Sequence, residues 1–331
     1  MGFFNHDPYR DMRISTADKY GRYMNLLWHP GQGNIFKTII SGGDVDGRNR
    51  VLISLIKMAW GQGNGSGALP MPMIILHVNN GQLHQTLCRG VENAVIRGEG
   101  SFPMDPLVGI DKPGDAASIL YNACNAASPN GKPAARLREA FKIGAELILM
   151  QGGRLSISAL HELPWSSVSD YIEQLADRGQ LSQEEAMHLI SRAGNVQDEL
   201  YTAEDYIHEL NGQFTFDGRD ERTIGLLETI NRSGRVCVNL RSNSNSAIRE
   251  LFSELIKSKI AGSGRQFLLI LDSINIKEGD SLWNLTTGDC CGYSCILTGS
   301  DIPGMMGDNF RAFAAGSTNV IAFSHPSGTS S

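Results

Sequence analysis

The sequence predicts an α/β protein with a mostly parallel sheet and an inserted all-helical segment. Short apolar runs of strand length alternate with amphipathic helical stretches, which is typical of a parallel sheet covered on both faces. Between about residues 155 and 222 this alternation stops, and polar-rich helical stretches follow one another until the strand-like Phe214–Phe216. Glycine is also abundant, at 37 of 331 residues, which favours a loop-rich α/β chain over a helical bundle.

The predicted strands are short, aliphatic or β-branched, and bounded by turn residues. We expect them at 34–41, 71–77, 235–240, 266–271, 293–297 and 320–323. Apolar residues recur at helical spacing between these runs, which predicts helices at 50–60, 115–127, 134–150 and 246–261. Within the helical segment, Ser182 and Glu185 have the spacing of a capping box, in which the two side chains satisfy each other's free amides.

This order of elements divides the chain into three parts. Residues 1–34 form an N-terminal arm, 35–154 and 223–331 form an α/β core, and 155–222 form an all-α insertion. The run GQGNGSGALP at 61–70 has the composition of a flexible connection within the core.

Composition excludes several classes of protein. Hydrophobic residues make up 41% and charged residues 19%, so the chain can bury a core. The net charge of -6 argues against a generic basic nucleic-acid binder and against direct DNA binding, although a local basic surface is compatible with it. The longest apolar runs are of strand length, so we expect no membrane segment. Six cysteines do not make a disulfide scaffold; Cys290, Cys291 and Cys295 are expected to be incidental thiols in a cytoplasmic protein.

The turn after the first predicted strand is the first candidate site. It reads from Gly42 through Gly47, Arg48 and Asn49, one step from the phosphate-loop pattern GxxxxGK[ST]. A strand precedes it and a helix follows, so backbone amides at a helix N-terminus would face a phosphate. Arg48 keeps the positive charge but is a planar fork, and Asn49 lacks the hydroxyl that helps to hold Mg²⁺. An ordinary strand–turn–helix corner explains the pattern equally well.

Two acids in this turn, Asp44 and Asp46, leave two alternatives open. If they point outward, the loop binds nucleotide or phosphate weakly and without Mg²⁺, with Arg48 as the essential cation. If they fill the cradle, the loop is a structural corner. Electrostatics favour the filled cradle, because two acids beside a phosphate cost more than one arginine recovers in a partly exposed loop.

The second candidate site is the end of the most apolar strand, where QFLLIL runs into Asp272 and Ser273. P-loop ATPases place a carboxylate near Mg²⁺ in this way, usually beside a Glu that polarises water. Asp272 is therefore the candidate metal ligand and catalytic acid. Ser273 occupies the position of the base, for which a hydroxyl is poorly suited. A strand that simply ends in a turn-forming Asp-Ser is the structural alternative.

The order of these pieces resembles the coupling proteins of type IV secretion and conjugation, which are hexameric P-loop ATPases related to the DNA translocases of cell division. The resembling segments are IISGGDVDGRNRVLISLI at 39–56, MIILHVNNGQLHQTL at 73–87, FPMDPL at 102–107, GRVCVNL at 234–240, FLLILDS at 267–273 and CGYSCILTGSDIPGM at 291–305. The resemblance implies a RecA-like P-loop NTPase core with a mostly parallel sheet, and it makes the inserted segment the family's all-α domain.

The same resemblance implies a degenerate member. Arg48 and Asn49 replace the family's Lys and Ser/Thr, Ser273 replaces the Glu, and Gly299 replaces the Gln of a sensor triplet that reads Thr298–Ser300 here. Val78–Asn80 stands where the family usually has Asp-Pro-Lys. The implied role is a structural or regulatory partner of other secretion components or of a full-length coupling ATPase, alone or as a homo-oligomer. ATP and Mg²⁺ are the cofactors implied, and the replacements argue against both. The alternatives are an active ATP-driven translocation motor, and a small-ligand or protein-binding module that reuses the cleft.

Overall fold

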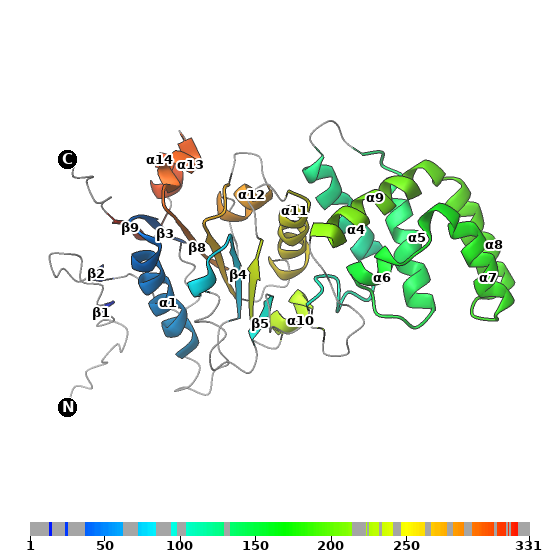
Figure 1. Ribbon diagram of the computed structural model, residues 1–331, viewed down its shortest axis with the longest axis horizontal. Helices are drawn as coiled ribbons and strands as arrows, with labels where there is room; N and C mark the ends of the chain where they lie inside the picture. Colours follow the sequence, from blue (N-terminus) through cyan, green and yellow to red (C-terminus); the bar gives the residue numbers. More distant parts are fainter. Residues whose placement is uncertain are drawn as a thin grey trace, which may run out of the picture.

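The computed structural model describes a parallel α/β sheet with a group of helices at one end (Figure 1). The sheet has seven strands in the order β5-β6-β4-β7-β8-β3-β9, and each neighbouring pair is parallel. The prediction of an α/β core with a mostly parallel sheet is therefore confirmed. The described residues are 13–14, 24–25, 37–61, 72–83, 94–97, 104–128, 133–213, 223, 225–231, 234–240, 246–261, 266–276, 281–287, 293–307, 310–315, 317 and 319–323.

The first part of the core runs from β3 (Lys37–Gly42) through α1 (Val45–Gly61) to β4 (Met73–His77) and β5 (Ala94–Arg97). The helix predicted at 50–60 begins five residues earlier than expected, at Val45, because Asp44 caps it. Strand β5 was not predicted, and it lies at one edge of the sheet. The connection was predicted at 61–70, but Gly61 is the last residue of α1, and 62–70 lie outside the described residues. Most of the N-terminal arm also lies outside them; the arm contributes a short antiparallel pair, β1 (Arg13–Ile14) and β2 (Met24–Asn25).

Helices follow β5 without a strand across the described residues 104–213. They are α4 (Pro113–Ala127), α5 (Leu137–Met150), α6 (Ile157–His161), η1 (Trp165–Ser167), α7 (Val168–Asp177), α8 (Gln183–Gly194) and α9 (Gln197–Gln213). The part of the predicted insertion that is described, 155–213, is thus helical, while Phe214–Phe216 lies outside the described residues. Helix α5 packs on α4 and α9, so the helical group begins before residue 155 and the insertion bounds remain a prediction.

The chain then returns to the sheet. The returning elements are α10 (Leu226–Asn231), β6 (Arg235–Asn239), α11 (Ser246–Leu255) with its π-helical continuation η2 (Ile256–Ile260), β7 (Leu268–Asp272), α12 (Ser281–Thr287), β8 (Ser294–Gly299), α13 (Ile302–Met306), α14 (Phe310–Ala315) and β9 (Asn319–Phe323). Five of the predicted strands coincide with β4, β6, β7, β8 and β9 to within two residues at each end, and the described part of the first is β3.

Alternation along the buried strands gives the sheet two apolar faces. Ile40, Ile75 and Ile270 pack with α1 on one face, whereas their neighbours Ile39 and Leu271 join the larger core that contains α4 and α11. Figure 1 shows α1 and α11 on opposite sides of the strands, with α5 to α9 gathered beyond α11. This layering leaves the carboxyl ends of the strands as one edge where polar residues can gather.

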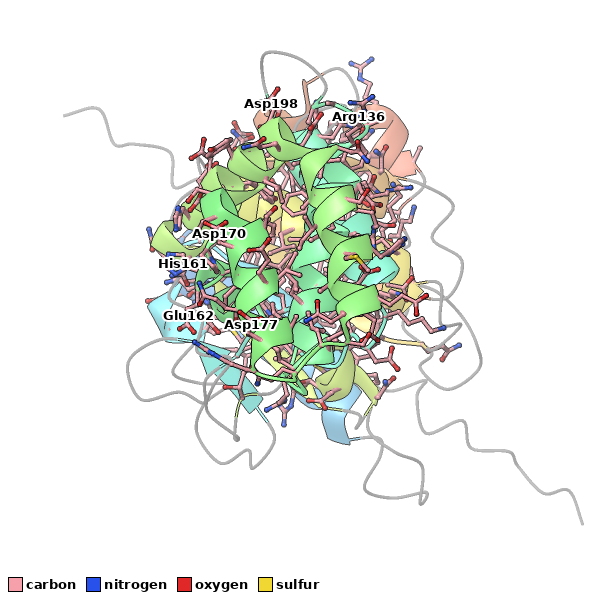
Figure 2. The ribbon with its side chains drawn as sticks, turned by 90° about the vertical axis from the view of Figure 1, so that its right-hand side faces the viewer. Arg136, His161, Glu162, Asp170, Asp177 and Asp198 are labelled. Atoms are coloured by element: carbon pink, nitrogen blue, oxygen red, sulfur yellow. The ribbon has the colours of Figure 1, made fainter. Side chains whose placement is uncertain are left out.

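The helical group carries acidic side chains on its outer end, away from that edge. Figure 2 looks onto this end and shows Asp170, Asp177 and Asp198 at the surface of α7 and α9.

In the part of the chain that the structure describes, no helix has the length and apolar character needed to cross a membrane. The described cysteines, Cys124, Cys237 and Cys295, are buried; Cys290 and Cys291 lie outside the described residues.

Candidate functional site

The candidate site lies where four adjacent parallel strands end. His77 of β4, Asp272 of β7 and Thr298 of β8 are register partners across neighbouring strands, and Ser41 of β3 pairs with Gly299. Strand β8 therefore separates the strand that enters the glycine turn from the strand that ends on Asp272. Ligands of open α/β sheets bind outside the carboxyl ends of the strands, so this edge is where a site is expected.

The turn between β3 and α1 consists of Gly43 and Asp44. Gly42 and Gly43 have φ of 86° and 66°, a conformation that glycine adopts without strain, and the helix starts two residues later. Gly47, Arg48 and Asn49 consequently lie inside α1 rather than in a loop. The Asp44 side chain accepts a hydrogen bond of 2.6 Å from the Gly47 backbone amide, as a helix N-cap residue does. One of the first amides of α1 is thereby occupied by an acid of the chain itself.

The Arg48 side chain points into the protein, toward the glycine turn that precedes it in the sequence. Its guanidinium Nη1 donates to the carbonyl oxygens of Gly42 at 3.0 Å and Gly43 at 2.8 Å, and the residue is 4% exposed. A buried arginine needs a nearby acid, and its charge favours the ionised form of Asp272. The arginine that the sequence placed in the phosphate-loop pattern thus holds the turn together.

Phe323 explains why the turn contains glycine. A Cβ on Gly42 would come within 2.3 Å of the Phe323 carbonyl oxygen, and one on Gly43 within 2.8 Å of the Phe323 Cβ. A Cβ on Gly47 would lie 3.7 Å from the Phe323 ring. Strand β9 brings Phe323 to this place because Gly42 and Phe323 are register partners. The glycines make room for the end of β9.

A buried chain of amides connects α1 to Asp272. Asn49 Nδ2 donates to Asn80 Oδ1 at 3.1 Å and to Gln82 Oε1 at 2.6 Å. Asn80 Nδ2 donates in turn to Asn49 Oδ1 at 2.8 Å and to Asp272 Oδ2 at 2.6 Å. Asn80 itself is held by the segment after β4, where its backbone amide donates to His77 Nδ1 at 3.1 Å and its Oδ1 accepts from Leu83 N at 3.1 Å. The network fills the space between the helix and the acid with paired polar groups.

Asp272 is 1% exposed, and burial raises the pKa of its carboxyl group. Hydrogen bonding by Asn80 and the charge of Arg48 oppose that rise in pKa, as do the smaller contributions of Ser273 and Thr298. Ser273 has a φ of 58°, an uncommon value for a non-glycine residue, and its hydroxyl lies 3.4 Å from Asp272 Oδ1. The Ser273 backbone amide is bound to the Thr298 carbonyl oxygen at 2.7 Å.

The sensor-like triplet lies next to these residues. Thr298 is fully buried beside Asp272, while Ser300 is exposed at the end of the strand. A Cβ on Gly299 would come within 2.8 Å of the terminal methyl group of Ile302, so a larger residue there requires that side chain to shift. The structure therefore brings Arg48, Asn49, Asp272, Ser273 and Thr298 to one edge. Gly42 lies beside Arg48 and Phe323 at the turn, and Gly47 donates to Asp44.

These residues do not fit a magnesium–nucleotide complex. Mg²⁺ in nucleotide sites is bound by one or two carboxylates together with waters and phosphate oxygens, and here the candidate carboxylate oxygen, Asp272 Oδ2, already accepts a hydrogen bond of 2.6 Å from the Asn80 amide. Asn49, at the position where a hydroxyl would help to hold the metal, directs its amide nitrogen at the side-chain oxygens of Asn80 and Gln82. Among the described residues no group of three or more His, Cys, Asp or Glu side chains is arranged to hold a metal ion.

Sequence reasoning missed Asn80, Gln82 and Phe323 as members of this site. In the sequence, Val78–Asn80 stands out only as a departure from a family pattern, which does not connect Asn80 to Asp272. A polar pair directly after a buried strand, here Asn79-Asn80, was the signal that could have placed Asn80 at the strand edge. No local pattern marks Phe323.

The comparisons with known proteins leave the family of the chain open. No protein-family model matches the chain, and no curated protein matches it. Among solved structures, the chain is similar to VirB4 of Thermoanaerobacter pseudethanolicus, with 12% sequence identity and a TM-score of 0.47. The matched region covers 95% of this chain and 84% of that chain.

Proposed function

We propose that the chain is a catalytically degenerate relative of the ATPases of type IV secretion and conjugation, and that it acts as a structural or regulatory partner with little or no hydrolysis. The observation that carries this proposal is the hydrogen bond of 2.6 Å between the Asn80 amide and the Asp272 carboxylate. In this site the acid that would face Mg²⁺ is bound to a neutral amide. The link to secretion systems rests on the order of the resembling segments.

The groups around Asp272 support the loss of hydrolysis. A general base contributes about 10²–10⁴-fold to such a reaction, and the neighbouring residue is Ser273. Asn49 offers an amide where a hydroxyl normally helps to bind the metal, and it is bound to Asn80 and Gln82. ATP and Mg²⁺ are therefore not required by the proposed role, and its partners are other secretion or conjugation components.

Phosphate release from ATP by the full chain tests this proposal. We expect the wild-type rate to equal the buffer background with and without Mg²⁺. Asp272→Asn identifies any activity that belongs to this site, and Asp170→Asn, the same substitution at an exposed position of α7 outside the site, is the matched control. Wild-type turnover of about 1 s⁻¹ or more that Asp272→Asn abolishes and Asp170→Asn retains would overturn the proposal, because this is an ordinary enzyme rate.

A further inference from the structure

We infer that the glycine turn excludes phosphate because three residues of the chain itself, Asp44, Arg48 and Phe323, already close it. This inference rests on the proposed function and extends it from the metal side of the site to the phosphate side. It makes the turn a structural joint between β3, α1 and β9 that needs no nucleotide. The residues that exclude phosphate are therefore different from those at the metal, base and sensor positions.

Asp44 takes the place of a bound anion. The first amides of a helix attract negative charge, and here the Gly47 amide already donates to Asp44 Oδ1 at 2.6 Å. A phosphate that approached this amide would have to displace the carboxylate, and it would then meet a like charge held at the same turn. Asp46 lies in the same first helical turn and is also exposed, but it is not the capping residue.

Arg48 gives a second, independent indication that this turn has the chemistry of an anion site. The side chain is 4% exposed, its Nε has no hydrogen-bond partner, and its Nη1 is bound to the carbonyl oxygens of Gly42 and Gly43. A cation with unused donor capacity therefore lies buried directly against the turn. The guanidinium group, which could bind phosphate oxygens, instead donates to two carbonyl oxygens of the chain itself.

Phe323 closes the remaining side. The approach of its carbonyl oxygen and Cβ to Gly42 and Gly43 uses the space that the missing side chains leave. The ring also lies against Gly47, so it spans the turn from β3 to the first turn of α1. Backbone surfaces that a phosphate would have to approach are thus covered by the end of β9.

One consequence separates this inference from simple loss of catalytic residues. If exclusion comes from Asp44 and Phe323, restoring the family's groups with Arg48→Lys, Asn49→Thr and Ser273→Glu will not restore nucleotide binding. Replacing the excluding residues will create anion binding even though those catalytic groups remain absent. Anion binding then reports on the glycine turn, and hydrolysis reports on the residues around Asp272.

Calorimetry with pyrophosphate and ADP in the absence of Mg²⁺ tests the inference on the full chain. The variants are Asp44→Ser, which keeps a capping oxygen for α1 without its charge, and Asp44→Ser combined with Phe323→Ala, which removes the ring that faces Gly43 and Gly47 but keeps the backbone of β9. Asp46→Ser is the matched control, because it removes the same charge from the same helical turn. We expect no detectable binding by the wild type or Asp46→Ser, and measurable binding by Asp44→Ser with a Kd at least ~10-fold below the detection limit of the wild-type titration, because the charge at the amide is removed.

The wild type itself provides a test that needs no variant. We expect its melting temperature to be unchanged by ADP or pyrophosphate, since a ligand that binds the folded state would raise it. Two results would overturn the inference: clear wild-type binding that Arg48→Ala abolishes, or no binding by a folded Asp44→Ser protein and its double variant. Binding without hydrolysis would refute this inference and leave the proposed function standing, whereas hydrolysis would refute both.

Discussion

Asn80 donates a hydrogen bond of 2.6 Å to Asp272, which links the segment after β4 to the last residue of β7. The two residues are 192 positions apart in the sequence and are 7% and 1% exposed. Burial raises the pKa of Asp272, and this hydrogen bond is the first of the contributions that oppose the rise. The stability of the edge therefore depends on a neutral donor at position 80.

Asn80→Asp is expected to destabilise the protein by about 3 kcal/mol near pH 7, because it places a second acid against a buried carboxylate without a cation for it. The two acids raise the pKa of the pair above the unfolded value. The variant then loses stability as pH rises from the unfolded pKa to the folded pKa. The difference in free energy of unfolding between the wild type and the variant therefore becomes smaller at acid pH. Urea unfolding at several pH values measures it.

Gln82→Glu is the matched control for this experiment. It adds the same charge to the same network at an exposed residue, so its cost is expected to stay within ~0.5 kcal/mol. A pH-independent deficit for Asn80→Asp, or equal deficits for the two variants, would contradict the role assigned to the Asn80–Asp272 contact.

Gly144→Ala is expected to destabilise the helical group by about 1–3 kcal/mol through overpacking. The added Cβ would lie 2.4 Å from the far edge of the Trp165 ring. The ring is 1% exposed and its Nε1 donates to the Leu160 carbonyl oxygen at 2.8 Å, so it cannot turn away without losing that bond. Gly212→Ala in α9 is the control, because no atom lies within 4 Å of its added Cβ. It should be neutral or stabilising by up to ~1 kcal/mol; equal losses for the two would refute the packing argument.

The fold was readable from the sequence because its strands are buried on both faces. Such strands appear as continuous apolar runs, and QFLLIL is β7 to within two residues at its start. The start of α1 was not readable in this way. Asp after a pair of glycines is equally typical of a turn and of a helix N-cap, and the choice depends on whether Asp44 reaches the Gly47 amide.

Part of the candidate site could also be predicted from the sequence, because some of its residues lie next to recognisable strands. Arg48 and Asp272 stand at fixed positions relative to strands, so local sequence context marked them as candidates. Asn80 and Phe323 join the site through strand order, which places β4 beside β7 and β9 beside β3. Local periodicity carries no information on which distant strands become neighbours.

Glu185→Gln is expected to weaken the acid sensitivity of the protein. Hydrogen bonds from the Ser182 hydroxyl and backbone amide lower the pKa of Glu185 in the capping box of α8, so its contribution is present above the unfolded pKa and is lost as pH falls through the folded pKa. Glutamine keeps an acceptor for the box but does not titrate. Melting temperatures between about pH 6 and pH 3 should fall less for this variant than for the wild type. The melting temperature of Glu184→Gln, which changes the adjacent charge outside the box, should fall as much as that of the wild type. If the melting temperatures of the two variants depend on pH in the same way, the prediction is wrong.

Asp105 is expected to be the residue that most strongly ties α6 to the core. Its carboxylate is fully buried and accepts hydrogen bonds from the Leu107 amide at 3.0 Å and from the Ile157 amide, in the first turn of α6, at 2.7 Å. Asp105→Ala leaves both amides without this partner, so we expect a loss of about 2–6 kcal/mol in urea unfolding, at about 1–3 kcal/mol for each buried unsatisfied group. Asp105→Asn keeps one acceptor oxygen and should lose about half as much. Ser156→Ala removes the side-chain cap of the same helix and provides the scale, at about 1 kcal/mol. Equal losses for Asp105→Ala and Ser156→Ala would mean that Asp105 contributes no more than an ordinary helix cap.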